Sequence, residues 1–378
     1  MIIFIVGILL ILYSIVSKQR YSVGMGMLFV LLIIGFQEGL QTDYPNYMNT
    51  FNSGGAGMNS WSDTTKEGEF SYIWITQLCS RIMSFHMFVF LTSVVQCLAM
   101  GLIIKRYAVK QFSQFGVLLV FFTTNIMLIQ MTAMRQAYAT DCLLLAYYLL
   151  GRKYYFLSII IAVIAYGFHN STLVVLPFFV ALWMLMYLRR KKKNDEIVPV
   201  VIKNSQGRAT ALWVAVGLFG FYLVKYVFFA SYINPILEGM EMFSYSDYLD
   251  QFEKDTMISW WILLYHVVIV FFVTLYCVNE HNLYRRYLGI LVIVSMFLNI
   301  GTFGFGNLMR VGMFFVIFSI VVYPNIAAML RFSYGKPAAL AFVLFNMAYL
   351  MLFSVRNMLS RDYSSATGFY SYTFSFLN

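Results

Sequence analysis

Six charged or polar side chains stand at one end of the hydrophobic segments of this chain, where they could bind and activate a charged substrate. They are Asp43, Glu69, Arg135, His169, Asp247 and Arg310. Hydrocarbon disfavours such groups, so those that remain beside a membrane usually serve a function. We interpret the set as a site at one membrane face.

Two arginines in this set point to an anionic substrate. Arg135 and Arg310 each lie at the start of an apolar segment. A guanidinium group presents a planar fork of donors that matches phosphate oxygens, and two of them neutralise a diphosphate better than one. Gln136, next to Arg135, is a candidate substrate-binding residue. The structural alternative is that Arg135 reaches out to lipid headgroups.

Three other residues are candidates for a general base. An imidazole exchanges protons near neutral pH, which suits His169, and the carboxylates of Asp43 and Glu69 are also able to accept a proton. Each has a structural alternative. His169 could be a hydrogen-bonded turn residue, Asp43 a solvated loop carboxylate, and Glu69 a favourable charge at a helix start. The sequence does not choose among them.

Aromatic and acidic loop residues provide candidate sugar contacts. Tyr44 and Tyr47 follow Asp43 and offer ring faces on which a sugar could stack, although tyrosines are common at membrane interfaces. Asp247 and Tyr248 lie in a second acidic loop and could contact a polyhydroxy substrate. A solvated loop is the alternative for both.

The composition defines the class of protein that must position these residues. Of 378 residues, 61% are hydrophobic and 11% are charged, which is far from a soluble globular protein. Apolar runs near the roughly 20 residues needed to cross a bilayer recur along the chain. We predict an all-α polytopic membrane protein with about 10 to 12 transmembrane helices in one integral membrane domain, residues 1–378.

The expected segments can be given by range. They cover residues 2–16, 22–40, 86–104, 113–132, 136–150, 154–168, 172–188, 211–230, 258–278, 288–306, 310–330 and 338–355. Residues 70–85 carry Gln77 and Arg81 among apolar residues, so we expect an interfacial or re-entrant helix on the outer surface there.

The distribution of charge predicts the orientation. Lys and Arg gather in alternate loops, among them the basic loop at about 189–210, and such loops stay in the cytoplasm. The acidic loops at about 37–69 and 231–257 then face outward. The net charge of +10 is spread over separate loops, so it indicates orientation and gives no support for nucleic-acid binding.

Other motif classes find no support in the sequence. The four cysteines show no CxxC pair or His/Cys spacing of a zinc site, and no nucleotide-binding glycine motif follows a strand. No DxD-type carboxylate pair lies in a cytoplasmic loop. We therefore expect no cofactor and predict a metal-independent reaction.

Several of these motifs, in this order, resemble the EpsG-like, Wzy-type polymerases of bacterial surface polysaccharide. The motifs are Thr42-Asp43-Tyr44-Pro-Asn-Tyr47, Glu69, Met134-Arg135-Gln136-Ala-Tyr-Ala139, the stretch from Ala165 through His169-Asn-Ser171, and Arg310. The Arg-Gln-x-x-Ala and Phe-His-x-Ser elements together are moderately specific. The family pattern has an arginine where this chain has Gln37 and a glycine where it has Gln41.

The resemblance implies a membrane glycosyltransferase that joins undecaprenyl-diphosphate-linked oligosaccharide repeat units. The reaction would take place at the outer face of the bacterial cytoplasmic membrane, with other polysaccharide assembly proteins as candidate partners. Two alternatives remain open. A flippase or other transporter would place polar groups along a central path, for which Asp141, Lys225 and His266 are the candidates. A membrane O-acyltransferase would use His169 from a site that opens inward.

Overall fold

The computed structural model describes most of the chain. It covers residues 22–38, 43–54, 69–122, 126, 133–189, 200–202, 205–228, 260–301, 306–359 and 373–374. The predicted first helix at 2–16 and the acidic loop at 231–257 lie outside these residues. Within the described part, four helices are long and apolar enough to cross a membrane, and shorter apolar helices accompany them. The protein is an all-α polytopic membrane protein.

The fold divides into two compact units. The first comprises Met1–Ile197 with Leu340–Asn378, and the second comprises Val198–Ala339. The prediction of a single integral membrane domain stays a prediction. The elements of the first unit are α2 (Ser22–Gly35), β1 (Gln37–Glu38), α3 (Asp43–Asn52), α4 (Phe70–Ser80), α5 (Phe85–Tyr107), η2 (Lys110–Phe112), α6 (Ser113–Phe122), α8 (Met134–Gly151), α9 (Tyr155–Phe168), α10 (Thr172–Leu188) and β2 (Thr373–Phe374).

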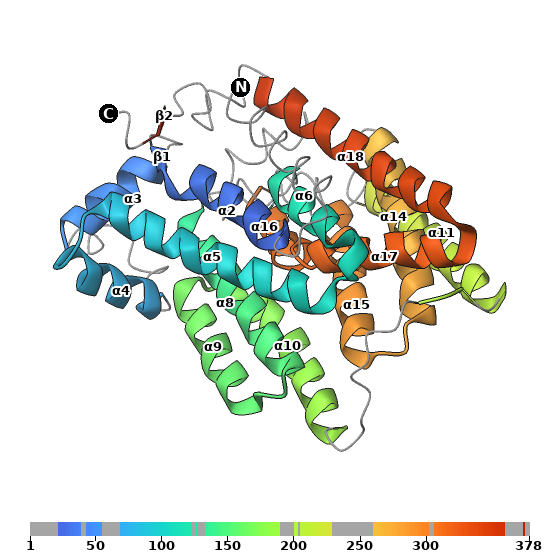
Figure 1. The fold of residues 1–378 in the computed structure, drawn as a ribbon, viewed down its shortest axis with the longest axis horizontal. Helices are drawn as coiled ribbons and strands as arrows, with labels where there is room; N and C mark the ends of the chain where they lie inside the picture. Colours follow the sequence, from blue (N-terminus) through green and yellow to red (C-terminus); the bar gives the residue numbers. More distant parts are fainter. Residues whose placement is uncertain are drawn as a thin grey trace. The chain divides into compact units, whose positions relative to one another are not determined.

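Ring contacts show that α5 and α8 run in the same direction through the first unit. The Phe88 and Tyr138 rings meet near the start of both helices at 6.1 Å, and the Tyr107 and Tyr148 rings meet near their ends at 6.4 Å. The helices α8, α9 and α10, green in Figure 1, lie side by side. Because α9 and α10 are joined by a short turn, they run in opposite directions. The unit therefore has two distinct ends.

One end of the first unit is basic. Lys105 and Arg106 close α5, Arg152 and Lys153 follow α8, and Arg189 follows α10. The other end carries α3, α4 and the turn between α9 and α10. A short antiparallel ladder at that end pairs Gln37 with Phe374 and Glu38 with Thr373, so the last strand of the chain lies beside the end of α2.

Helix α4 has the two faces expected of a helix at a membrane surface. The side chains of Phe70, Trp74 and Leu78 are exposed and recur every four residues, so they form one apolar stripe. Tyr72 and Thr76 on the opposite face are buried in the protein. With 11 residues the helix is too short to span a bilayer, in keeping with the predicted interfacial or re-entrant segment.

Helices make up the described part of the second unit. They are α11 (Ser205–Phe228), α14 (Trp260–Asn279), α15 (Leu283–Gly301), α16 (Gly306–Val316), α17 (Ser319–Tyr334) and the first turn of α18 (Lys336–Leu359). The Tyr222 ring near the end of α11 meets the Trp260 ring at the start of α14 at 6.4 Å. Lys225 Nζ donates a hydrogen bond of 2.9 Å to the Ile300 carbonyl near the end of α15.

The predicted single segment at 310–330 is two helices. Helix α16 ends at Val316 and α17 begins at Ser319, with a tight turn at Ile317 and Phe318 between them. The turn is held by a bond from the Phe318 amide to the Phe315 carbonyl. The residues around the turn, Met313–Phe318, are all apolar, so hydropathy alone gave no sign of the break.

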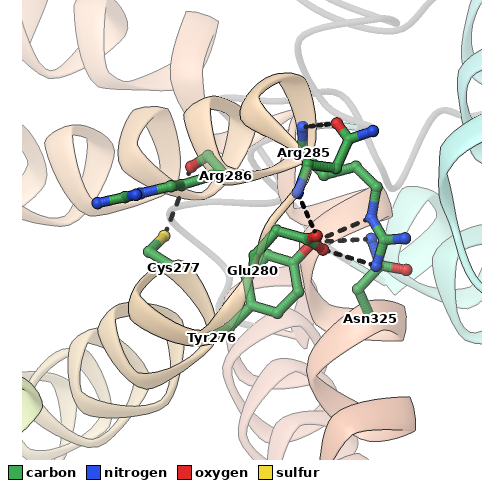
Figure 2. A network of polar contacts seen from close by, with 7 residues as sticks. Tyr276, Cys277, Glu280, Arg285, Arg286 and Asn325 are labelled. Atoms are coloured by element: carbon green, nitrogen blue, oxygen red, sulfur yellow. Dashed lines mark hydrogen bonds and ion pairs between the residues drawn. The ribbon is translucent and has the colours of Figure 1, made fainter. Parts of the chain in front are cut away.

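A buried polar network joins three helices of the second unit (Figure 2). The Tyr276 hydroxyl donates to Glu280 Oε2 at 2.9 Å, and Arg285 Nη2 forms an ion pair with the same oxygen at 2.8 Å. Arg285 Nε and Asn325 Nδ2 each donate to the Tyr276 hydroxyl at 3.3 Å. Buried charges of this kind need such partners. Arg285, one of the basic residues that the charge pattern assigns to a cytoplasmic loop, lies in α15 and is 1% exposed.

Candidate functional site

Three of the predicted site residues meet at one carboxylate in the first unit. Glu69 Oε1 lies 3.1 Å from His169 Nδ1, and Glu69 Oε2 forms an ion pair with Arg135 Nη1. The residues are 66 and 100 positions from Glu69 along the chain. We call this set the Glu69 cluster.

Each member of the Glu69 cluster is held by a helix end. Glu69 immediately precedes α4, Arg135 lies in the first turn of α8, and His169 is the residue that ends α9. The short turn after His169 leads directly into α10, since the Thr172 amide donates to the His169 carbonyl at 3.0 Å. Helix ends present backbone and side-chain groups that are not consumed within the helix, so this junction of four helices is suited to binding.

Burial orders the cluster in depth. The side chain of Glu69 is 6% exposed, whereas those of Arg135 and His169 are each 23% exposed. The carboxylate is thus the most buried of the three groups. It is compensated by the other two, as a buried charge requires, and both of them remain partly exposed.

An aromatic wall supports the cluster. The Arg135 guanidinium lies over the Tyr47 ring, 6.0 Å from its centroid, a geometry that favours a cation. The Tyr47 ring meets the Tyr72 ring edge-on at 6.1 Å, and Tyr138 meets Phe168 at 5.7 Å. Burial raises the pKa of the Tyr72 phenol, so this hydroxyl stays neutral beside the ion pairs.

A glycine contact sets the spacing of α4 and α9. A Cβ atom placed on Gly167 would lie 2.6 Å from Phe70 Cζ and would also overlap Ser71 Oγ. A larger residue would therefore displace the Phe70 and Ser71 side chains at the start of α4. Because Gly167 lies two residues before His169 and Phe70 follows Glu69, this close approach lies next to the contact between the carboxylate and the imidazole.

The remaining predicted residues are placed as follows. Gln136 is 2% exposed in the first turn of α8, and its backbone carbonyl accepts a hydrogen bond of 2.8 Å from the Thr140 hydroxyl. Tyr44 is buried, with its ring edge-on to Phe85 at 5.3 Å. That packing gives Tyr44 a structural role here, and its predicted sugar contact stays a prediction. Tyr47 is buried as well but lies against Arg135.

Four predicted residues lie partly or wholly outside the described structure. Asp43 begins α3, but its side chain is not among the described ones. Arg310 is the fifth residue of α16, in the second unit, and its side chain is likewise outside. Asp247 and Tyr248 lie outside the described residues altogether. Among the described residues, no group of three His, Cys, Asp or Glu side chains could hold a metal ion.

The residues considered for a transport path are held within the helices. Lys225 Nζ bonds the Ile300 carbonyl, and His266 Nδ1 lies 2.7 Å from the Ile262 carbonyl. Asp141 is 3% exposed in α8. Lys225 and His266 belong to the second unit and Asp141 to the first. In the described structure Lys225 and His266 are each paired with a backbone carbonyl, which accounts for their presence in apolar helices.

Comparison with known proteins places the chain in a family. The EpsG family model matches residues 20–374, nearly the whole chain. The chain therefore belongs to the EpsG family, and it is a polysaccharide polymerase-type membrane protein. No curated protein and no solved structure matches it.

Proposed function

We propose that this protein is a glycosyltransferase that polymerises undecaprenyl-diphosphate-linked oligosaccharide repeat units at the outer face of the bacterial cytoplasmic membrane. The observation that carries the proposal is the Glu69 cluster, in which the partly exposed side chains of Arg135 and His169 share one buried carboxylate. Family membership supports the reaction class. The cluster stands at the end of the first unit opposite the basic helix ends, which supports an outward-facing site.

The cluster has the parts that this reaction needs. His169 Nδ1 faces Glu69, and in the tautomer with the proton on Nδ1 the Nε2 lone pair is the proton acceptor for a sugar hydroxyl. The hydroxyl oxygen then bonds to the anomeric carbon of the donor while the bond from that carbon to the diphosphate breaks. Arg135 holds the departing diphosphate, which finally takes the proton from His169. Glu69 fixes the tautomer and the ring orientation, as the acidic member of a catalytic triad does.

A diphosphate is already a good leaving group, so positive charge is the main requirement for its departure. The guanidinium of Arg135 supplies such charge without a metal ion, and Arg310 remains a predicted second source. We expect activity in the presence of excess EDTA, measured as polymer formed by the purified protein from lipid-linked repeat units. Loss of activity that a divalent cation restores would contradict metal independence.

The test of the proposed function is the length distribution of surface polysaccharide in a deletion strain. The strain is complemented with wild type, Arg135→Ala, His169→Ala or Arg310→Ala, and the membrane level of each variant is measured. Removal of a positioned donor or of a general base lowers rates by roughly a hundredfold or more. We therefore expect single repeat units from each well-expressed variant.

The matched control is Arg81→Ala, because Arg81 is an exposed arginine at the end of α4 that lies outside the cluster. It should give long chains, as wild type does. Long chains from all three site variants would show that Arg135, His169 and Arg310 have structural roles only, and would contradict the proposal. An accumulation of repeat units on the cytoplasmic side in the deletion strain would favour a transporter instead.

A further inference from the structure

The end of the first unit opposite the Glu69 cluster carries an aromatic clamp. Trp183 and Tyr187 of α10 stack at 5.1 Å with ring planes 6° apart, and Tyr155 of α9 meets both edge-on. Trp183 Nε1 donates to the Tyr155 carbonyl at 3.1 Å, and the Tyr155 hydroxyl donates to the Met186 carbonyl at 3.2 Å. The start of α9 and the end of α10 are thereby fixed side by side.

Basic and apolar side chains surround this clamp. Arg152 and Lys153 come just before Tyr155, and Arg189 comes two residues after Tyr187. Arg152 and Arg189 are exposed. Tyr154 and Phe156 beside them are 55% and 79% exposed. Tryptophan and tyrosine with nearby lysine and arginine are typical of the level of lipid headgroups.

Lys153 is in a backbone conformation that a lysine rarely adopts. Its φ is +68°, and it is the one non-glycine residue with positive φ in the part of the chain that the structure describes. The Lys153 amide bonds to the Leu150 carbonyl at 2.9 Å and the Tyr154 amide to the Leu149 carbonyl at 3.0 Å. This is the helix ending at which glycine is usual. A side chain there costs about 1–2 kcal/mol, so a lysine in this place indicates a use for its ammonium group.

We propose that Arg152, Lys153 and Arg189 form a binding site for the headgroup phosphate of an anionic phospholipid, with the clamp and the exposed Tyr154 and Phe156 packing on its glycerol and upper acyl carbons. We call it the headgroup site. The inference follows from charge complementarity and from the strained Lys153, and it does not depend on the proposed enzyme activity. A bound lipid here would hold the α9–α10 pair at a fixed depth, and that pair carries His169 at its other end.

The headgroup site can be tested by lipid binding. The purified full chain in detergent is titrated with dioleoylphosphatidylglycerol or dioleoylphosphatidylcholine, and the bound lipids are counted by native mass spectrometry. Each basic residue near an anionic surface contributes roughly a fivefold change in affinity. We expect Lys153→Gly to weaken phosphatidylglycerol binding by about that factor and to leave phosphatidylcholine binding unchanged.

Lys153→Gly separates binding from folding, because glycine relieves the strained backbone and should raise or preserve the melting temperature. Lys153→Asn is the second variant, since asparagine also tolerates this conformation and removes the charge. The control is Lys336→Gln, an exposed lysine at the start of α18. Wild-type affinity for phosphatidylglycerol in both Lys153 variants, or an equal loss in Lys336→Gln, would overturn the proposal.

Discussion

At the scale of residues, the Glu69 carboxylate decides how the cluster works. Its two oxygens face two different partners, so a single buried group orients both Arg135 and His169. Neither partner is as deeply buried as the carboxylate. Removal of Glu69 would therefore affect both Arg135 and His169. Removal of Arg135 or of His169 leaves the other one paired with Glu69.

Glu69→Gln is expected to lower the polymerisation rate by about a hundredfold or more while the protein still inserts, because the amide cannot hold both the imidazole tautomer and the guanidinium. The measurement is the rate at which the purified protein forms polymer from lipid-linked repeat units. The matched control is Glu67→Gln, a neighbouring carboxylate two residues earlier in the chain. A rate near wild type in Glu69→Gln would show that the carboxylate is only a helix-start charge.

At the scale of elements, the site depends on how closely α4 approaches α9. Gly167→Ala would place a methyl group against the Phe70 and Ser71 side chains, and we expect the start of α4 to shift and carry Glu69 away from His169. We expect at least a tenfold loss of polymerisation rate with normal membrane levels, on the reasoning that small misplacements of catalytic groups are costly.

The control for this change is Gly217→Ala in α11. An added Cβ there meets nothing within 4 Å, and alanine favours helix over glycine by about 1 kcal/mol. Gly217→Ala should leave the rate unchanged and the stability equal or higher. If Gly167→Ala also keeps its rate, the contact between α4 and α9 does not position the site.

The polar network in the second unit gives a prediction about stability. Arg285→Met would leave Glu280 as a buried charge without its ion-pair partner, which typically costs about 3–5 kcal/mol. The double variant Glu280→Gln/Arg285→Met should be less destabilised than the sum of its two single variants. Thermal or denaturant unfolding in detergent measures the three values. Strict additivity would mean that Glu280 and Arg285 do not interact energetically.

The sequence predicted the elements far better than the contacts between them. Long apolar runs correspond to α5, α14 and α15 because hydropathy alone marks a segment that can cross a bilayer. The turn between α16 and α17 was missed because it interrupts no hydrophobic pattern. Glu69 and His169 were both candidates for a base, yet their pairing over 100 residues leaves no local sequence signal. Arg285 was assigned to a loop because its partner Glu280 is supplied only by the folded hairpin.

At the scale of the whole molecule, charge separates the two ends of the first unit. Basic residues close α5, α8 and α10 at one end, and the Glu69 cluster with α3 and α4 lies at the other. Basic helix ends stay in the cytoplasm during insertion. The ladder between β1 and β2 places β2 beside the end of α2, at the end of the first unit that carries the cluster.

This polarity predicts which positions a membrane-impermeant maleimide can reach on intact cells. In a background without the four native cysteines, Asn170→Cys, in the turn beside His169, should be labelled from outside. Lys110→Cys, after the basic end of α5, should be labelled only after permeabilisation, because a charged reagent does not cross hydrocarbon. The reverse pattern would put the cluster in the cytoplasm. An imidazole there would face soluble acyl donors, so that outcome would remove the lipid-linked donor from reach and favour a membrane O-acyltransferase.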